Sequence, residues 1–259
     1  MSRKPSIQSI GLLGFGAFGR LIARHLHRHF RLVVSDPALE PGPPIFANVR
    51  AGTLAEAARC DLVILAMPMD ALAPALGDLR PHLAAGTVVV DTVSVKVEPA
   101  RIMLEGLPAD VEIIGTHPLF GPQSAKAGLR GHNIAICPVR AKGRTVRRIA
   151  GFLETELGLR VVQATPEEHD REAAVVQGLT HLIAKALVRM EPLPSQMTTA
   201  SYELLMQATE MVRHDADGVF TAIEQANPFA GEVRARFFAI AEDLRGELES
   251  STVQIDRAS

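Results

Sequence analysis

A histidine and a serine lie in two short segments whose residue types could perform acid–base chemistry. His117 belongs to GTHPLFGPQS (115–124) and Ser94 to DTVSVK (91–96), and each segment follows a β-branched run that predicts a strand. A neutral histidine can take a hydroxyl proton near pH 7 while a hydride leaves the same carbon for a nicotinamide, and a serine can orient either group. Structural alternatives exist: Ser94 could cap a helix, and His117 could be a turn residue.

A glycine-rich segment near the start of the sequence has the spacing of a dinucleotide-binding loop. Gly14, Gly16 and Gly19 form G-x-G-x-x-G between a predicted strand and a predicted helix. The backbone of this loop could hold a pyrophosphate at the helix N-terminus, with Phe15, Ala17 and Phe18 between the glycines. The alternative is a strand–helix turn that binds no ligand.

Asp36 strengthens the dinucleotide interpretation. It ends the second predicted strand, 22 residues after Gly14, where a carboxylate can accept hydrogen bonds from the ribose hydroxyls of adenosine. Its negative charge would repel a 2′-phosphate, which predicts NAD as cofactor, with NADP less favoured. An approach of Arg20 or Arg31 to this pocket would weaken that preference.

Another segment is expected to face the same cofactor. Ala66, Met67 and Pro68 follow a continuously apolar run. Ligands of open α/β sheets bind beyond the carboxyl ends of the strands. We therefore expect these residues, Ser94 and His117 to lie at one edge of a sheet.

The C-terminal part offers candidates for a substrate pocket. Asp170, Ala174, Gln177 and His181 are spaced by four, three and four residues, which predicts one stripe of a helix. Arg213 could bind a carboxylate with its guanidinium fork. Alternatively, the stripe is a polar helix seam and Arg213 complements a helix dipole.

A cluster of histidines could bind a metal, but its composition argues against this. His25 and His29 are one helical turn apart, with His27 between them, and no carboxylate or cysteine completes a ligand set. The end of a solvated helix is the favoured interpretation, so we expect no metal.

Up to residue 164, the sequence repeats one pattern of secondary-structure elements, and these elements must position the residues named above. Short apolar runs alternate with helical stretches, which predicts a doubly wound, Rossmann-type α/β domain with a parallel sheet over residues 1–164. The predicted strands are SIGLL (9–13), RLVVS (31–35), DLVILA (61–66), TVVVD (87–91), VEIIGT (111–116), HNIAIC (132–137) and RVVQA (160–164). PALEPGPP (37–44) predicts a surface loop.

Residues 165–259 predict a second, all-helical domain. Thr165, Pro166 and Glu168 form the start signal of a helix that we expect to run to about Met190, where EPLP stops it. Two further helical stretches follow. Such a small set of helices has little core of its own, so we expect it to pack on the first domain and on a second subunit.

Bulk composition indicates an ordinary globular protein. The chain has 259 residues, 47% hydrophobic and 22% charged, with a formal net charge of −2, which gives no support to nucleic-acid or membrane binding. Its two cysteines have no metal-binding spacing, and there is neither a secretory signal nor an apolar run long enough for a membrane span. We therefore expect a cytoplasmic location.

Three ordered blocks resemble the prephenate and arogenate dehydrogenases of tyrosine biosynthesis. GTHPLFGPQS resembles that family's G-x-HPMFGP block, DTVSVK its D-x-x-SVK block, and EEHDREAAVVQGLTH (167–181) its EHD…Q…H segment. The resemblance implies that His117 is the catalytic base, that Ser94 hydrogen-bonds within the site, and that Gln177 and His181 line the substrate pocket. Arg213 would meet a substrate carboxylate, and the helical domain would form a homodimer.

The implied reaction is the NAD-dependent oxidative decarboxylation of a cyclohexadienol. It predicts activity that rises with pH through a pKa near about 6.5, as His117 becomes neutral. Family members selective for arogenate often carry an acid after the HP block, where this chain has QSAKAG (123–128), which favours prephenate. The GTHPLFGP segment resembles the corresponding segment of plant arogenate enzymes, which favours arogenate.

Two other functions remain open from the sequence. A β-hydroxyacid dehydrogenase or an imine reductase would rely on a lysine of the helical domain, for which Lys185 is the candidate. A non-catalytic NAD-binding protein would need the glycine loop and Asp36, but it has no use for His117, Ser94, Gln177 and His181 together.

Overall fold

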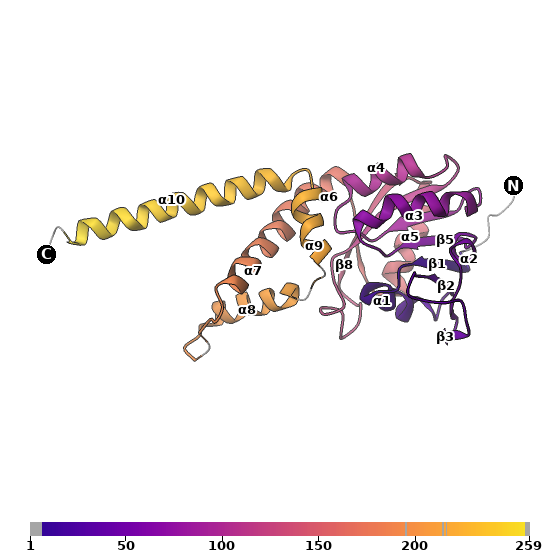
Figure 1. Ribbon diagram of the computed structural model, residues 1–259, viewed down its shortest axis with the longest axis horizontal. Coiled ribbons are helices and arrows are strands. Elements are labelled where there is room, and N and C mark those ends of the chain that lie inside the picture. The colour runs from indigo at the N-terminus through magenta and orange to yellow at the C-terminus, as the bar shows by residue number, and fades with distance from the viewer. Residues whose placement is uncertain (1–6, 195, 214, 216, 257–259) are drawn as a thin grey trace. The chain divides into compact units, whose positions relative to one another are not determined.

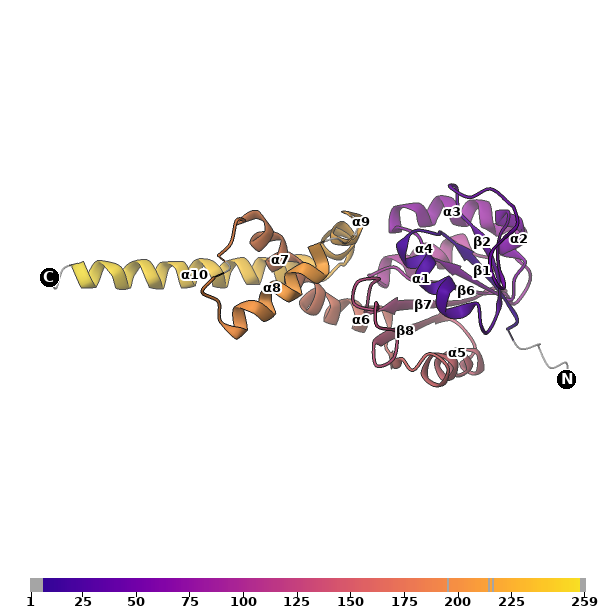
Figure 2. The same cartoon turned by 90° about the horizontal axis from the view of Figure 1, so that it is seen from below.

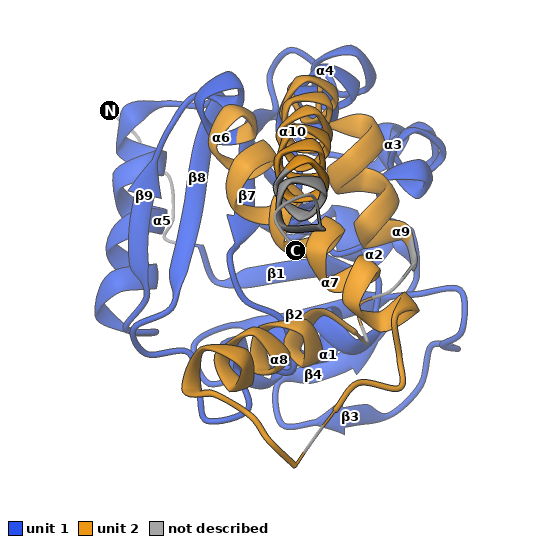
Figure 3. Ribbon diagram, turned by 90° about the vertical axis from the view of Figure 1, so that its left-hand side faces the viewer, with its two compact units in different colours: residues 1–169 blue, residues 170–259 orange. Residues whose placement is uncertain are grey.

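The computed structural model describes residues 7–194, 196–213, 215 and 217–256. The chain divides into two compact units, residues 1–169 and residues 170–259 (Figure 3). This division falls inside a helix, five residues beyond the predicted boundary between 164 and 165, and it leaves His169 in unit 1.

Unit 1 is the doubly wound α/β domain that the sequence predicts. Its nine-stranded sheet has the order β3-β4-β2-β1-β5-β6-β7-β8-β9. The strands are β1 Ser9–Leu13, β2 Arg31–Ser35, β3 Pro44–Phe46, β4 Val49–Ala51, β5 Leu62–Leu65, β6 Val88–Asp91, β7 Glu112–Pro118, β8 Asn133–Arg140 and β9 Arg160–Gln163.

Helices cover both faces of this sheet, so its central strands are continuously buried. Figure 2 shows α2, α3 and α4 on one face and α1 and α5 on the other. Their bounds are α1 Ala17–Leu26, α2 Leu54–Ala58, α3 Leu72–Leu79, α4 Val97–Gly106 and α5 Gly143–Thr155, and two short 3-10 turns, η1 Met69–Ala71 and η2 Arg80–His82, flank α3.

The sheet departs from the predicted all-parallel pattern at two places. β8 is antiparallel to β7, because the connecting residues 119–132 form turns instead of a crossover helix. The strands β3 and β4 form an antiparallel edge pair that the sequence prediction missed, since three-residue strands leave too little pattern to recognise. Pro44, predicted to end a loop, begins β3, and a proline is tolerated on such an edge strand.

Unit 2 is helical, and its long first helix is interrupted by a π-helical turn. The helix α6 Pro166–Ala173 leads into the π turn η3 Ala174–Gly178 and then into α7 Leu179–Arg189. The remaining elements are α8 Ala200–Arg213, α9 Asp217–Thr221, the π turn η4 Ala222–Ala226 and the 27-residue helix α10 Ala230–Asp256 (Figure 1). Within the described residues, no helix combines the length and apolar character that a membrane crossing requires.

The predicted start of α6 is confirmed. The Thr165 amide donates to the Glu168 carboxylate at 2.8 Å, and the Glu168 amide donates to the Thr165 hydroxyl at 3.1 Å. This reciprocal capping box satisfies two amides that a helix N-terminus otherwise leaves unpaired.

Thr165→Ala should therefore lower the free energy of unfolding by about 1 kcal/mol, because one capping acceptor is lost. Chemical denaturation followed by circular dichroism measures the change. Thr180→Ala is the matched control, since the Thr180 hydroxyl only bonds back to the Val176 carbonyl within the same helical segment. Equal losses in the two variants would contradict a capping role.

Candidate active site

The glycine loop connects β1 to α1. Glycine is present at its three positions for different physical reasons. Gly14 has a φ of +96°, and a Cβ there would lie 2.2 Å from the Ala66 carbonyl oxygen. A Cβ at Gly19 would lie 2.2 Å from the Gly14 carbonyl oxygen, so the helix packs directly on the turn. A Cβ at Gly16 would meet no atom within 4 Å. Gly14 and Gly19 are therefore required by the fold, whereas Gly16 faces open space at the N-terminus of α1.

Asp36 is held beside this loop, immediately after β2. Its Oδ2 accepts from the Phe15 amide at 2.6 Å, and its Oδ1 accepts from the Ala38 amide at 2.8 Å. The Arg20 guanidinium stacks over the Phe15 ring at 4.7 Å. Arg31 begins β2 and thus lies at the opposite end of that strand from Asp36. Of the two arginines that could bear on cofactor choice, only Arg20 lies near the loop.

His117 is buried near the end of β7, at the sheet edge where β1 and β2 also end. Its side chain is 3% exposed, and its Nδ1 lies 2.9 Å from Nε2 of the buried His169. Burial lowers the pKa of His117 well below 6.5, and the charges of His169 and Lys96 lower it further. The sequence predicts that activity rises with pH through a pKa of about 6.5. Because the pKa of His117 is lowered, we expect this rise at lower pH.

His169 was missed as a candidate by the sequence analysis. It lies in α6 within the quoted EHD segment, so the motif contained the signal, but nothing in its spacing from His117 indicated contact. A hydrogen bond between two ring nitrogens requires one to donate and the other to accept. If Nδ1 of His117 donates to His169, its Nε2 keeps the lone pair that a general base needs.

A buried ion pair lies behind the histidine pair. The Lys96 side chain is 1% exposed, and its ammonium contacts the Asp91 carboxylate and the Thr116 carbonyl, the latter at 2.6 Å. The Thr116 hydroxyl donates to the Asp91 carbonyl. Complete burial raises the pKa of Asp91, and the Lys96 charge opposes that shift. Both residues belong to the DTVSVK segment, whose residue types alone do not predict this contact.

Ser94 lies half-buried in the bend between β6 and α4. The N-cap position of α4 is held by Lys96, whose side chain does not cap the helix, and Ser94 lies two residues before it. The helix-cap interpretation of Ser94 is therefore wrong. Ala66, Met67 and Pro68 follow β5, and the Ala66 carbonyl borders the glycine loop at Gly14.

Three candidate site residues of unit 2 each contact a charged or aromatic side chain of the same unit. His181 is buried in α7, with Nε2 3.8 Å from an Asp215 carboxylate oxygen, and burial lowers its pKa. The Arg213 guanidinium pairs with Glu191 and with Glu210, which holds the pKa of Arg213 above its ordinary value. Lys185 lies over the Phe220 ring at 5.2 Å.

The predicted polar stripe crosses the π turn and does not keep regular α-helical geometry. Asp170, Ala174 and His181 are buried, and Ala174 is the first residue of η3. Gln177 lies later in the same π turn and is only half-buried. A π turn closes its hydrogen bonds one residue later than an α turn. The spacing of four, three and four thus describes the buried face at Asp170, Ala174 and His181 but not at Gln177.

Two histidines that follow α1, His27 and His29, make aromatic contacts. The ring of His27 packs edge-on against Phe46 at 5.1 Å, and that of His29 packs edge-on against Phe152 at 5.2 Å. Within the described ranges, no three His, Cys, Asp or Glu side chains gather closely enough to hold a metal ion.

Comparisons with known proteins find similarities between this chain and prephenate or arogenate dehydrogenases. Residues 45–163 match the model of the prephenate dehydrogenase nucleotide-binding domain. The chain is 29% identical to arogenate dehydrogenase 1, chloroplastic, of Arabidopsis thaliana, over 92% of this chain and 39% of that protein. It is also 29% identical to arogenate dehydrogenase 2, chloroplastic, of the same plant, over 95% of this chain and 71% of that protein. The chain thus spans less than two thirds of the first of these relatives.

A solved structure shares the fold over almost the full length of both chains. The crystal structure of prephenate dehydrogenase from A. aeolicus in complex with hydroxyphenyl propionate and NAD+ aligns with a TM-score of 0.61. The alignment covers 99% of this chain and 100% of that one, at 18% sequence identity.

The lowered pKa of His117 predicts an acid-sensitive fold. Below pH 6.5, His117 binds a proton in the unfolded chain but stays neutral in the folded chain. The free energy of unfolding therefore falls as the pH decreases towards the pKa of His117 in the folded chain. The slope from one such group is at most about 1.4 kcal/mol per pH unit. Urea unfolding at several pH values between 7.5 and 5 should give a flatter dependence for His117→Asn than for the wild type. The exposed His82→Asn variant is the control, and parallel curves for wild type and His117→Asn would contradict the prediction.

Proposed function

We propose that the chain is a member of the prephenate and arogenate dehydrogenase family, which the match of residues 45–163 and the similarity to two plant arogenate dehydrogenases support. On this basis it catalyses the oxidative decarboxylation of prephenate or arogenate, with hydride transfer to NAD, in tyrosine biosynthesis. One observation carries the proposal: the buried pair of His117 and His169 lies at the sheet edge that also holds the glycine loop and Asp36. Cofactor site and base thus meet where doubly wound sheets bind ligands.

The residues at that edge fit a dinucleotide. The open space above Gly16 admits a pyrophosphate to the N-terminus of α1, where no side chain caps the free amides. Asp36 stands where adenosine ribose hydroxyls would donate hydrogen bonds, and its charge favours NAD over NADP. When bound, NAD supplies the hydride acceptor.

In the proposed mechanism, His117 acts as the general base through Nε2. His169 holds the ring orientation because its Nε2 accepts a hydrogen bond from Nδ1–H of His117, and burial keeps the His117 imidazole neutral. As His117 takes the hydroxyl proton, the ring carbon gives up its hydride and the ring carboxylate leaves as CO2. The substrate ring becomes aromatic, so the main tasks of the protein are positioning and charge stabilisation.

We assign the remaining site residues by the same proposal. Ser94 orients His117 or the substrate hydroxyl, and the neutral, buried His181 lines the substrate pocket with Gln177. For Arg213, binding a substrate carboxylate requires that the carboxylate displace Glu191 from the guanidinium.

Charge near the segment after His117 favours prephenate. Residues 122 and 125–128 share a cavity of about 490 Å³ with Arg20 and Arg24 of α1, and Lys126 also lines it, while no carboxylate does. Such a cationic surrounding disfavours the ammonium group of arogenate relative to the keto group of prephenate. Similarity to the two plant arogenate dehydrogenases makes arogenate the second candidate.

We further propose that unit 2 forms a homodimer. Ile240, Leu244 and Leu248 are 49%, 53% and 71% exposed and follow one another at four-residue spacing on α10. This spacing places them on one helix face, and a second copy would remove that apolar stripe from water.

The function is tested by following reduced cofactor with NAD or NADP, each combined with prephenate or arogenate. We expect the highest kcat/KM with NAD and prephenate. His117→Asn should lower kcat by at least about 100-fold, because proton removal is lost. His82→Asn is the control for an exposed histidine. Absence of reduced cofactor in all four mixtures would refute the proposed dehydrogenase activity. A wild-type kcat in His117→Asn would refute the role of His117 as the general base.

The glycine loop gives a separate prediction for cofactor binding. Gly16→Ala should keep its stability and bind NAD at least about tenfold more weakly, because its methyl group enters the space of the pyrophosphate. Gly14→Ala should instead destabilise the fold, since its φ is positive and its Cβ meets the Ala66 carbonyl. Calorimetric NAD titration and thermal unfolding measure the two effects. Unchanged NAD affinity in Gly16→Ala would exclude this binding mode.

The dimer is tested by light scattering after size-exclusion chromatography. Leu244→Glu should convert a dimeric wild type into a monomer, because it places a charge in the apolar stripe. Arg245→Gln, one residue away and also exposed, should remain dimeric. A monomeric wild type would disprove the proposal.

A further inference from the structure

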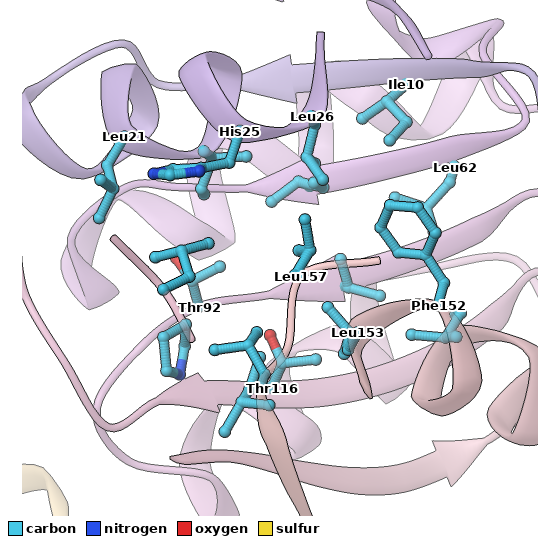
Figure 4. Close-up of a pocket in the computed structure, with 18 of the residues that line it drawn as sticks. Ile10, Leu21, His25, Leu26, Leu62, Thr92, Thr116, Phe152, Leu153 and Leu157 are labelled. Carbon is cyan, nitrogen blue, oxygen red and sulfur yellow. The ribbon is translucent and has the colours of Figure 1, made fainter. Parts of the chain in front are cut away.

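A second cavity lies inside unit 1, on the face of the sheet that α1 and α5 cover. Its volume is about 270 Å³. Figure 4 shows Leu21 and Leu26 of α1 on one side and Leu153 of α5 on the other, with the strand residues Ile10 and Leu62 beside them. The wall is almost wholly aliphatic and aromatic.

The size of this cavity sets what could fill it. Protein interiors are close-packed, with few voids larger than a water molecule. An engineered apolar cavity of about 150 Å³ stays dry and binds benzene. A cavity of about 270 Å³ therefore accommodates a longer apolar body than a single ring.

Charge at the wall indicates which end of such a ligand is polar. His25 and the exposed Arg148 are the two lining residues that can carry a positive charge, and no aspartate or glutamate is among the residues that line the cavity. Neither Arg148 nor His25 forms an ion pair within the described residues. Burial lowers the pKa of His25, and the nearby charges of Arg24 and Arg28 lower it further. The electrostatic potential beside His25 is therefore positive.

We propose that this cavity binds a medium-chain fatty carboxylate, with its chain among the apolar side chains and its carboxylate against the Arg148 guanidinium. Apolar burial supplies the attraction, and the guanidinium supplies a charge-assisted hydrogen bond for the head group. This site is independent of the proposed dehydrogenase activity.

The position of the cavity connects it to the active site through one strand. Thr116 and Pro118 of β7 line the cavity, and His117 lies between them in sequence. Side chains alternate across a strand, so His117 is directed to the opposite face of the sheet. Thr116 also accepts the Lys96 hydrogen bond through its carbonyl. A ligand in the cavity would thus touch a residue that supports the histidine site without entering it.

The test is a calorimetric titration of the full chain with octanoate, which has no aromatic ring and so does not mimic a dehydrogenase product. Saturable binding with a Kd of about 1 mM or tighter is expected, with clearly weaker binding of octan-1-ol. Saturating NAD should leave the octanoate affinity unchanged. Absence of saturable binding would overturn the proposal, and equal affinity for the alcohol would overturn the carboxylate contact.

Two variants locate the site. Arg148→Gln should weaken octanoate binding about tenfold, whereas Arg147→Gln on the same helix, which does not line the cavity, should bind like the wild type. Leu157→Trp should abolish binding by filling the cavity. If Leu157→Trp does not fold, methyl NMR of the wild type decides: octanoate must shift Ile10, Ile64 and Ile134, which line the cavity, and unshifted signals would place the ligand elsewhere.

Discussion

The buried ammonium of Lys96 holds together the part of the structure on which the site depends. It joins the carboxylate at the end of β6 to the carbonyl beside His117 on β7, and it precedes the first residue of α4. A charge with almost no solvent exposure is tolerated only where fixed partners replace water. Because Asp91 and Thr116 are those partners, the ends of two neighbouring strands are held in one arrangement.

The same charge acts on the protonation of the histidine. Burial is the larger cause of the lowered pKa of His117, and the ammonium of Lys96 adds to it. The ring is thereby kept neutral, which is the form that a general base requires. One ion pair therefore contributes both to the position of His117 and to keeping its ring in the neutral form.

Much of this arrangement could be predicted from the sequence, because local patterns determine it. The bounds of β1 and β2, the glycine loop and the capping box of Thr165 follow from periodicity and from residue types at fixed spacing. The contact of His117 with His169 spans 52 positions and could not be predicted, since no local pattern encodes which distant residues meet. The antiparallel β8 was missed for a related reason: strand direction depends on how residues 119–132 return to the sheet.

The two π turns of unit 2 lie at η3 and η4, and they pack on one another. Gly178 of η3 faces Glu224 of η4, whose buried carboxylate pairs with Arg234 at 2.5 Å. Each π turn holds one residue more than the α turn that it replaces, so it amounts to a single-residue insertion absorbed without a loop. Relative to an uninterrupted α-helix, every side chain beyond such an insertion is rotated by about 100°. A relative that lacks the extra residue in η3 would therefore present a different set of side chains at the level of His181, even where the flanking sequences are identical.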